Sequence, residues 1–476
     1  MRPARTSALV LATGVFFGLA TTPISAPRAQ DVHGGERTAA PAPRYQSLRY
    51  LEDYSYLAHT RGDDPFDRLK YVPLWPGGHL SIGGQHRLRY EYLAPVDLAP
   101  ASAEPRESVL FVRNLLHADL VFHRQIRLFA QIGSFEALGA PARDEPPGAN
   151  LLDAPQFFLE IRGKARGVGI VARAGRQEMS LGSTRWVSAR DGTNVRQSFD
   201  LARISLSGRT WKNDTFFGTV PALERGVFDD APSFQSKFWG TYFTLAVAPG
   251  KAASLDAFYL GRDRPDVTYR EISGREVRHT LGVRAFGELA SGFEYIVHGL
   301  FQGGTVGDAS ILAWGFAGGL WQRLPGAFSP LRIGVRWDAL SGDSRAGDGT
   351  VSTFHPLFPN QTFFSALPAI YPTNLYEVHP LMQFERGTVS AEAGCTFFWR
   401  QAVEDAVYQP PGAPFIRATE SRAPFTAAQM SLSLGYRATR HLSFNAEYSH
   451  VFAGPAYVEA GGTDVDFFGT WTTFTY

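Results

Sequence analysis

The sequence predicts an all-β protein, a single transmembrane antiparallel β-barrel of about 18 strands with long loops on one rim and short turns on the other. Three observations predict this fold. Apolar and polar residues alternate along most of the chain, long and short connections alternate between these segments, and no apolar run is long enough to form a transmembrane helix. A chain of 476 residues, 44% of them hydrophobic, is large enough for such a barrel.

The first thirty residues have the order of a secretory signal. Arg2 and Arg5 precede an apolar run at 8–20, and small residues follow it. This run is too short to span a bilayer, so we expect residues 1–30 to be a cleaved signal peptide. A secreted chain that crosses a membrane with strands is expected in the outer membrane of a Gram-negative bacterium.

Period-two alternation is clear in the first barrel segment. Leu88 and Tyr90 share one face, whereas Arg87 and Arg89 share the other. A strand that separates hydrocarbon from a polar lumen needs this arrangement. The same pattern recurs in the segments 331–338 and 442–449.

The lengths of the connections favour a membrane barrel over a soluble sandwich or propeller. Connections after even-numbered segments are short turns, such as Gly208–Arg209 and Thr439–Arg440. One connection near Thr305–Asp308 is short where a long one is expected. This alternation of long and short connections predicts that the long loops are extracellular and the short turns periplasmic. About 18 strands also predict a lumen too wide for side chains alone to fill. We assign the long connections to residues 93–107, 136–153, 178–197, 221–233, 262–276, 340–373, 399–421 and 453–464.

The regions at the two ends complete the domain assignment. Residues 31–78 are rich in charged and aromatic side chains and contain five prolines, and we expect a periplasmic or lumenal extension. Residues 79–476 form the predicted barrel. Its last segment alternates through Phe468, Thr470, Thr472 and Phe474 and ends on Tyr476, the kind of terminal aromatic residue that outer-membrane barrels present to their assembly machinery.

Composition argues against several other classes of protein. The net charge is +1, with 46 basic and 45 acidic residues, so no global field marks a nucleic-acid partner. Cys395 is the only cysteine, which excludes a disulfide framework and a thiolate metal cluster. The chain contains neither a Gly-x-Ser-x-Gly elbow nor a His-Glu-x-x-His motif. We therefore expect no enzymatic activity, no cofactor and no metal.

Three groups of residues carry a family resemblance. The first comprises residues 48–54, 69–74 and 83–91, the second lies within 175–200, and the third lies within 342–375. In this order they resemble the alginate export family of outer-membrane porins. The resemblance implies an eighteen-stranded barrel with an arginine-rich passage for a polyanionic polysaccharide.

Ten residues are predicted to line that passage. Five lie on strand faces assigned to the lumen, and five flank or lie in the connection 178–197. Guanidinium groups pair bidentately with carboxylates, so a ladder of them suits a uronate chain. The predicted residues are Arg87, Arg89, Arg284, Arg332 and Arg336 on the strands, and Arg176, Arg185, Arg190, Asn194 and Arg196 around the loop.

Carboxylates are expected on the same lumen faces, which leaves a structural arginine–carboxylate ladder as the alternative. The function we expect is passive passage of an anionic solute, with export of an alginate-like polysaccharide as the main hypothesis. The alternatives are a diffusion porin for small organic acids or sugars and a structural or adhesion barrel. Expected partners are outer-membrane lipid, anionic polysaccharide or small anions, and a periplasmic export complex. The carboxylates are Glu91, Asp119, Glu160, Asp338, Glu392 and Glu447.

Overall fold

The structure is a computed structural model, and it describes residues 45–59, 64–95, 106–123, 125–248, 253–289, 292–363, 365–367, 370–410 and 412–476. The expected signal peptide lies outside these residues. Within the described ranges, no helix has the length and apolar character needed to cross a membrane.

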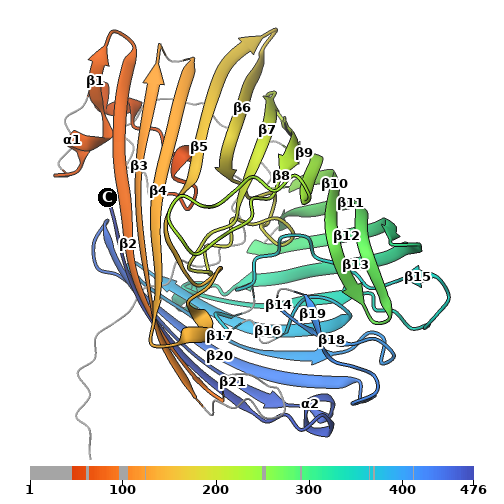
Figure 1. Cartoon of the computed structure of the whole chain (residues 1–476). Coiled ribbons are helices and arrows are strands. Elements are labelled where there is room, and N and C mark those ends of the chain that lie inside the picture. The colour runs from red at the N-terminus through yellow and green to blue at the C-terminus, as the bar shows by residue number, and fades with distance from the viewer. Residues whose placement is uncertain are drawn as a thin grey trace, which may run out of the picture.

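Eighteen antiparallel strands form the barrel, which β2 and β22 close by pairing (Figure 1). The predicted fold class is therefore confirmed. The strands are β2 (Gly78–Ala94), β3 (Glu107–Phe122), β4 (Ile126–Leu138), β5 (Asn150–Ala165), β6 (Val168–Glu178), β7 (Ser198–Ser207), β8 (Trp211–Thr219), β9 (Lys237–Ala248), β10 (Ala253–Tyr269), β11 (Ile272–Leu289), β12 (Phe293–Val306), β13 (Ala309–Arg323), β14 (Leu331–Leu340), β16 (Leu375–Arg386), β17 (Val389–Trp399), β20 (Phe425–Arg437), β21 (Leu442–Ala453) and β22 (Val465–Thr475).

Short elements complete the described chain. Strand β1 (Val72–Trp75) pairs with the start of β2, and β15 (Thr350–Val351) runs parallel to part of β13. Strands β18 (Val407–Gln409) and β19 (Ala413–Ile416) form a separate hairpin. The helices are η1 (Arg49–Leu51), η2 (Ser55–Ala58), α1 (Asp67–Lys70), η3 (Pro141–Arg143), η5 (Gly326–Phe328) and α2 (Pro455–Glu459).

Burial follows the alternation seen in the sequence. On β2, Arg87 is buried whereas the next residue, Leu88, is exposed on the outer face. On β13, Ile311 is 4% exposed and Leu312 is 56% exposed. Apolar side chains at alternate positions point outward, so the outer surface is compatible with lipid. The polar side chains of these strands lie on the opposite face, toward the lumen.

One of the predicted long connections, 262–276, is wrong. Strand β10 continues to Tyr269 and β11 begins at Ile272, so only two residues connect them. The polar stretch around Pro265 resembles a loop in sequence. In the structure, the pairing of β10 with β11 is irregular between Arg264 and Val267, so the proline is not required to donate a hydrogen bond between the strands. Tyr269 then packs in an apolar cluster with partners from other strands and loops. This tertiary contact extends the hairpin beyond what local sequence suggests.

Two long connections fold into the interior of the barrel and pack together there (Figure 1). We call them loop 179–197 and loop 341–374. Phe358 donates its backbone N–H to the carbonyl of Trp186 at 3.0 Å, and Ser188 donates to the carbonyl of Phe358 at 3.0 Å. Trp186 and Phe358 also share an apolar core with Phe238 of the barrel wall. The two loops therefore narrow the lumen, and contacts with each other and with the barrel wall hold them there.

The described N-terminal segment 45–59 also lies against the inside of the wall. The Tyr50 ring packs edge-on against Phe129 and Phe158, with ring centroids 6.2 and 5.5 Å away. Arg49 donates to the carbonyls of Gly84 and Tyr476 at 3.0 and 2.9 Å. The segment thus contacts both the wall and the β2–β22 seam where the barrel closes.

Candidate functional site

The lumen contains a cavity of ≈ 790 Å³ between the wall and the inward-folded loops. Its lining comes from β2, β11 to β14, β16, β17 and β20 to β22, together with segment 45–59 and both lumenal loops. Charges of both signs face this space, so it is not uniformly basic. The charged lining residues are Arg87, Arg89, Arg323 and Arg332, with Asp191, Glu288, Glu294, Glu385, Glu392 and Glu447.

Arginines on β2 hold the tip of loop 179–197 against the wall. Arg87 donates to the carbonyls of Asp191 and Thr193 at 2.8 and 3.0 Å, and Arg89 donates to the carbonyl of Gly192. Arg89 also forms an ion pair with Glu91. Among the described residues, Arg87 forms no ion pair with a carboxylate. Carbonyl oxygens satisfy hydrogen bonds without supplying a negative charge, so Arg87 adds a guanidinium to the charged group around Asp191.

Arg113 on β3 is a fully buried member of this group. It donates to the Asp191 carboxylate at 2.7 Å, and Arg196 pairs with the same carboxylate at 2.9 Å. Burial favours the neutral acid, yet Arg196, Arg113 and Arg87 together hold the pKa of Asp191 well below its usual range. Arg196 also pairs with Glu178 at 2.9 Å. Four guanidinium groups (Arg87, Arg89, Arg113 and Arg196) thus meet three carboxylates (Asp191, Glu91 and Glu178).

Arginines on β14 stand elsewhere on the wall. Arg332 lines the cavity and pairs with Glu294 at 2.5 Å. Arg336 pairs with Glu392 at 3.2 Å and donates to the carbonyl of Phe363 in loop 341–374. The β14 arginines are therefore matched by carboxylates, in contrast to Arg87.

Three of the ten predicted residues, Arg87, Arg89 and Arg332, line the cavity. The other seven lie outside its lining, and most of them tie loops to the wall. Asn194 donates to three backbone carbonyls, and the guanidinium carbon of Arg190 lies 5.9 Å from the centroid of the Phe358 ring. The remaining ion pairs are Arg176–Asp200, Arg185–Asp338, Arg196–Glu178, Arg284–Asp256 and Arg336–Glu392.

Sequence reasoning missed Arg113, Arg323 and Asp191. Arg113 alternates with outward Val112 and Asn114, so its inward position was available from the period-two pattern. Asp191 offered no such signal, because a loop residue has no periodicity and only the folded loop brings it to β3.

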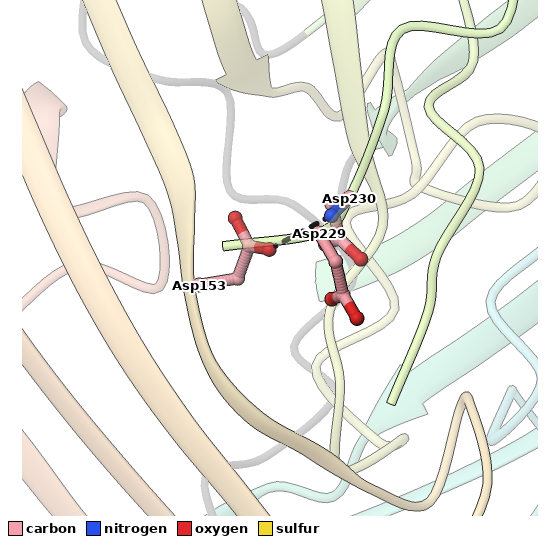
Figure 2. Close-up of side chains that lie close together, drawn as sticks. All are labelled: Asp153, Asp229 and Asp230. Carbon is pink, nitrogen blue, oxygen red and sulfur yellow. Dashed lines mark hydrogen bonds between the residues drawn. The ribbon is translucent and has the colours of Figure 1, made fainter. Parts of the chain in front are cut away.

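A cluster of acidic residues joins another long connection, loop 220–236, to the wall. Figure 2 shows Asp153 of β5 beside Asp229 and Asp230, and their nearest carboxylate oxygens lie within 4.8 Å of one another. Asp230 donates its backbone N–H to Asp153 at 3.1 Å and accepts hydrogen bonds from Asn150. Burial, with the nearby Asp153 charge, raises the pKa of Asp230 to about 6.

This raised pKa predicts that loop 220–236 docks more firmly in acid. The folded pKa of Asp230 exceeds its ordinary value, so the extra stability is complete below about pH 4 and is lost as the pH rises through about 6. After allowing for solvent screening of this partly exposed group, we expect an effect of about 1–2 kcal/mol. Hydrogen exchange of residues 222–230, corrected for intrinsic rates, should show stronger protection at pH 5 than at pH 7.5. Asp230→Asn should remove the difference, and protection that increases with pH would contradict it.

An antiparallel barrel with an apolar outer face and a polar lumenal cavity defines a channel of the outer-membrane porin class. Solved porins share this fold. The chain superposes on a BenF-like porin from Pseudomonas fluorescens Pf-5 with a TM-score of 0.57 at 9% identity, covering 83% of this chain and 99% of that one. Pseudomonas aeruginosa OpdO superposes with a TM-score of 0.55 at 10% identity, covering 86% of this chain and 98% of that one. P. aeruginosa OccK2 (OpdF), in complex with glucuronate, superposes with a TM-score of 0.54 at 10% identity, covering 83% of this chain and 97% of that one.

The family follows from the sequence match. The model of the alginate export family matches residues 79–470, so the chain belongs to that family and is an outer-membrane channel protein. A search of curated proteins found no significant match.

Proposed function

We propose that this channel passes acidic saccharides, with uronate-bearing chains as the main cargo. The observation that carries the proposal is Arg87, a cation bound only by backbone carbonyls at the point where loop 179–197 meets β2. Four guanidinium groups meet three carboxylates around it, so a passing carboxylate finds an excess of positive charge there.

The mixed lining supports a sugar rather than a simple anion. Carboxylates such as Glu392 and Glu447 face the same cavity as Arg87 and Arg332, and they accept hydrogen bonds from hydroxyl groups. An acidic sugar carries both groups, a carboxylate for the arginines and hydroxyls for the acids. Two comparisons agree with this reading. The chain belongs to the alginate export family, and one porin of the same fold was crystallised with glucuronate.

A second candidate is diffusion of small organic acids or short sugars. It is favoured by the joint occupation of the lumen by loops 179–197 and 341–374, which are bonded to each other through Trp186, Ser188 and Phe358. A polymer needs a continuous wide path, whereas a small solute needs only the space beside the loops. The two candidates differ in the length of the solute that passes.

Charge reversal at Arg87 tests the proposal. In planar bilayers we expect the unmodified channel to prefer anions, and Arg87→Glu to abolish or reverse the preference, because a fixed charge in a narrow constriction sets the local ion concentration. The preference should fade as the Debye length falls from about 10 Å at 0.1 M salt to about 3 Å at 1 M. Arg345→Glu on an exposed loop tip is the control and should behave as the unmodified protein.

Oligouronates of graded length separate the two candidates. For the main proposal, long oligouronates should block the current, and Arg87→Glu should weaken the block at least several-fold. Block by short acids alone would favour the diffusion porin. Cation selectivity of the unmodified channel, or a block that ignores Arg87, would refute the role given to this residue.

A further inference from the structure

A second group of arginines lies outside the cavity lining, where the lumenal loops meet strands β10 and β11. One of them, Arg278, is fully buried, and the other three are half-buried. Loop 179–197 contributes one arginine, and strands β10 and β11 contribute three. His355 and Tyr371 of loop 341–374 complete the group, with ring centroids 6.2 Å apart. None of these residues lines the cavity described above. The arginines are Arg190, Arg262, Arg264 and Arg278.

Positive charge exceeds negative charge in this group. Glu276 pairs with Arg264 at 2.5 Å and with Arg278 at 2.8 Å. Arg262 donates to the carbonyl of Leu357 at 2.7 Å, and the described residues provide neither it nor Arg190 with an ion pair. The guanidinium carbons of Arg262 and Arg190 lie 4.2 and 5.9 Å from the centroid of the same Phe358 ring. Four guanidinium groups therefore have one carboxylate among them.

Four buried nitrogen atoms of the group lack a hydrogen-bond partner, namely Arg190 Nε, Arg262 Nε, Arg278 Nη2 and His355 Nε2. The histidine nitrogen is a donor. Leu357 donates its backbone N–H to His355 Nδ1 at 3.0 Å, so the proton of the neutral ring is on Nε2. Burial and the surrounding Arg264, Arg262, Arg278 and Arg190 lower the pKa of His355 well below its usual value, which keeps the ring neutral.

The orphaned donors come from adjacent side chains. Arg278 donates to Gln302 Oε1 at 2.7 Å, and the backbone N–H of His355 donates to the same oxygen at 2.9 Å. Both residues are almost completely buried, with 0% and 3% of their surface exposed. A buried donor without an acceptor is costly, and a buried charge without a counter-charge is more so. Water would satisfy the donors but leave the charge, whereas an anion satisfies both.

We infer that this cluster binds a small inorganic anion, chloride or an oxyanion such as sulfate, between strands β10 and β11 and the two lumenal loops. The anion would fix Arg190 of loop 179–197 and His355 of loop 341–374 to the wall at once. It is a structural ligand and not a permeating one, since the site lies outside the cavity lining. The inference is independent of the proposed cargo.

The test measures the temperature at which purified protein in detergent loses its compact, fast-migrating form on gels. Sulfate is titrated against a bulky organic sulfonate at constant ionic strength. We expect a saturable rise of several degrees with sulfate, because a ligand that binds only the folded state stabilises it. Arg190→Gln removes one guanidinium that has no ion pair. It should raise the sulfate concentration at half-saturation about tenfold, the factor for the loss of one charge-assisted hydrogen bond.

Two controls keep the test decisive. Arg127→Gln removes a more deeply buried arginine that is paired with Asp119 and Glu160, so it should lower the starting temperature but preserve the sulfate response. Crystals grown with bromide should show an anomalous peak within hydrogen-bond distance of His355 Nε2 and Arg278 Nη2. The inference is overturned by an unmodified protein without a saturable anion response, by an unchanged response in Arg190→Gln, or by bromide crystals without a peak at this site.

Discussion

Deleting the tip of loop 179–197 is expected to raise the single-channel conductance several-fold. Residues 183–194 extend from the apolar core around Trp186 to the wall at β2 and β3, where Arg87 and Arg113 hold Asp191 and Thr193. An eighteen-stranded barrel without this segment has a wider aqueous lumen, which loop 341–374 and segment 45–59 still narrow. The measurement is single-channel recording of the variant, with a short glycine–serine linker in place of the tip.

The same deletion should weaken the preference for anions. It removes Arg185 and Arg190 together with Asp191, a net loss of positive charge, and it leaves Asp338 without its partner Arg185. The matched control shortens the exposed tip 344–349 of loop 341–374, which lies outside the cavity lining and should leave conductance and selectivity unchanged. Unaltered conductance after deletion of 183–194 would show that this loop does not limit the passage.

Replacing Tyr50 with alanine is expected to release the N-terminal segment from the lumen. Tyr50 is 4% exposed between Phe129 and Phe158, the Arg173 guanidinium covers its ring, and its hydroxyl donates to the carbonyl of Glu178 at 3.0 Å. Removing a buried aromatic side chain costs about 3–5 kcal/mol, and this loss falls on the docking of the segment because the barrel strands do not depend on it. We expect faster proteolysis within 45–58 and a larger conductance.

The conservative variant Tyr50→Phe separates packing from hydrogen bonding. It keeps the ring and loses only the bond to Glu178, which costs about 1 kcal/mol. The segment should then remain docked, with conductance close to that of the unmodified protein. If Tyr50→Ala leaves both proteolysis and conductance unchanged, the contacts of Arg49 with Gly84 and Tyr476 suffice to hold the segment. The segment would then have no gating role through Tyr50.

Local sequence was sufficient for most of the barrel, because a strand between lipid and a polar lumen must alternate. Leu88 and Leu312 are exposed, and their neighbours Arg87 and Ile311 are buried, as the period-two pattern requires. The prediction failed at 262–276, where polar residues and Pro265 indicated a loop. There the hairpin is stabilised by packing of Tyr269 against residues from other parts of the chain, which local patterns do not report.

The candidate site was predictable only in part. Alternation placed Arg87, Arg89 and Arg332 on the lumen side, and the structure places all three in the cavity lining. The alternation gave no information about which carboxylate or carbonyl would contact each arginine. Arg185 pairs with Asp338, 153 residues away, and Arg113 pairs with Asp191, 78 residues away.

By itself the sequence therefore determined the class of fold, the approximate number of strands and the side of the wall on which most strand residues lie, because these follow from a periodicity that the strands share. Tertiary structure alone decided where charge remains uncancelled. A buried ion pair cancels its charges only when the two groups meet, and the meeting depends on how loops 179–197 and 341–374 fold back into the lumen. The folded loop presents the carbonyl oxygens of Asp191 and Thr193 to Arg87, whereas the Asp191 carboxylate pairs with Arg113 and Arg196.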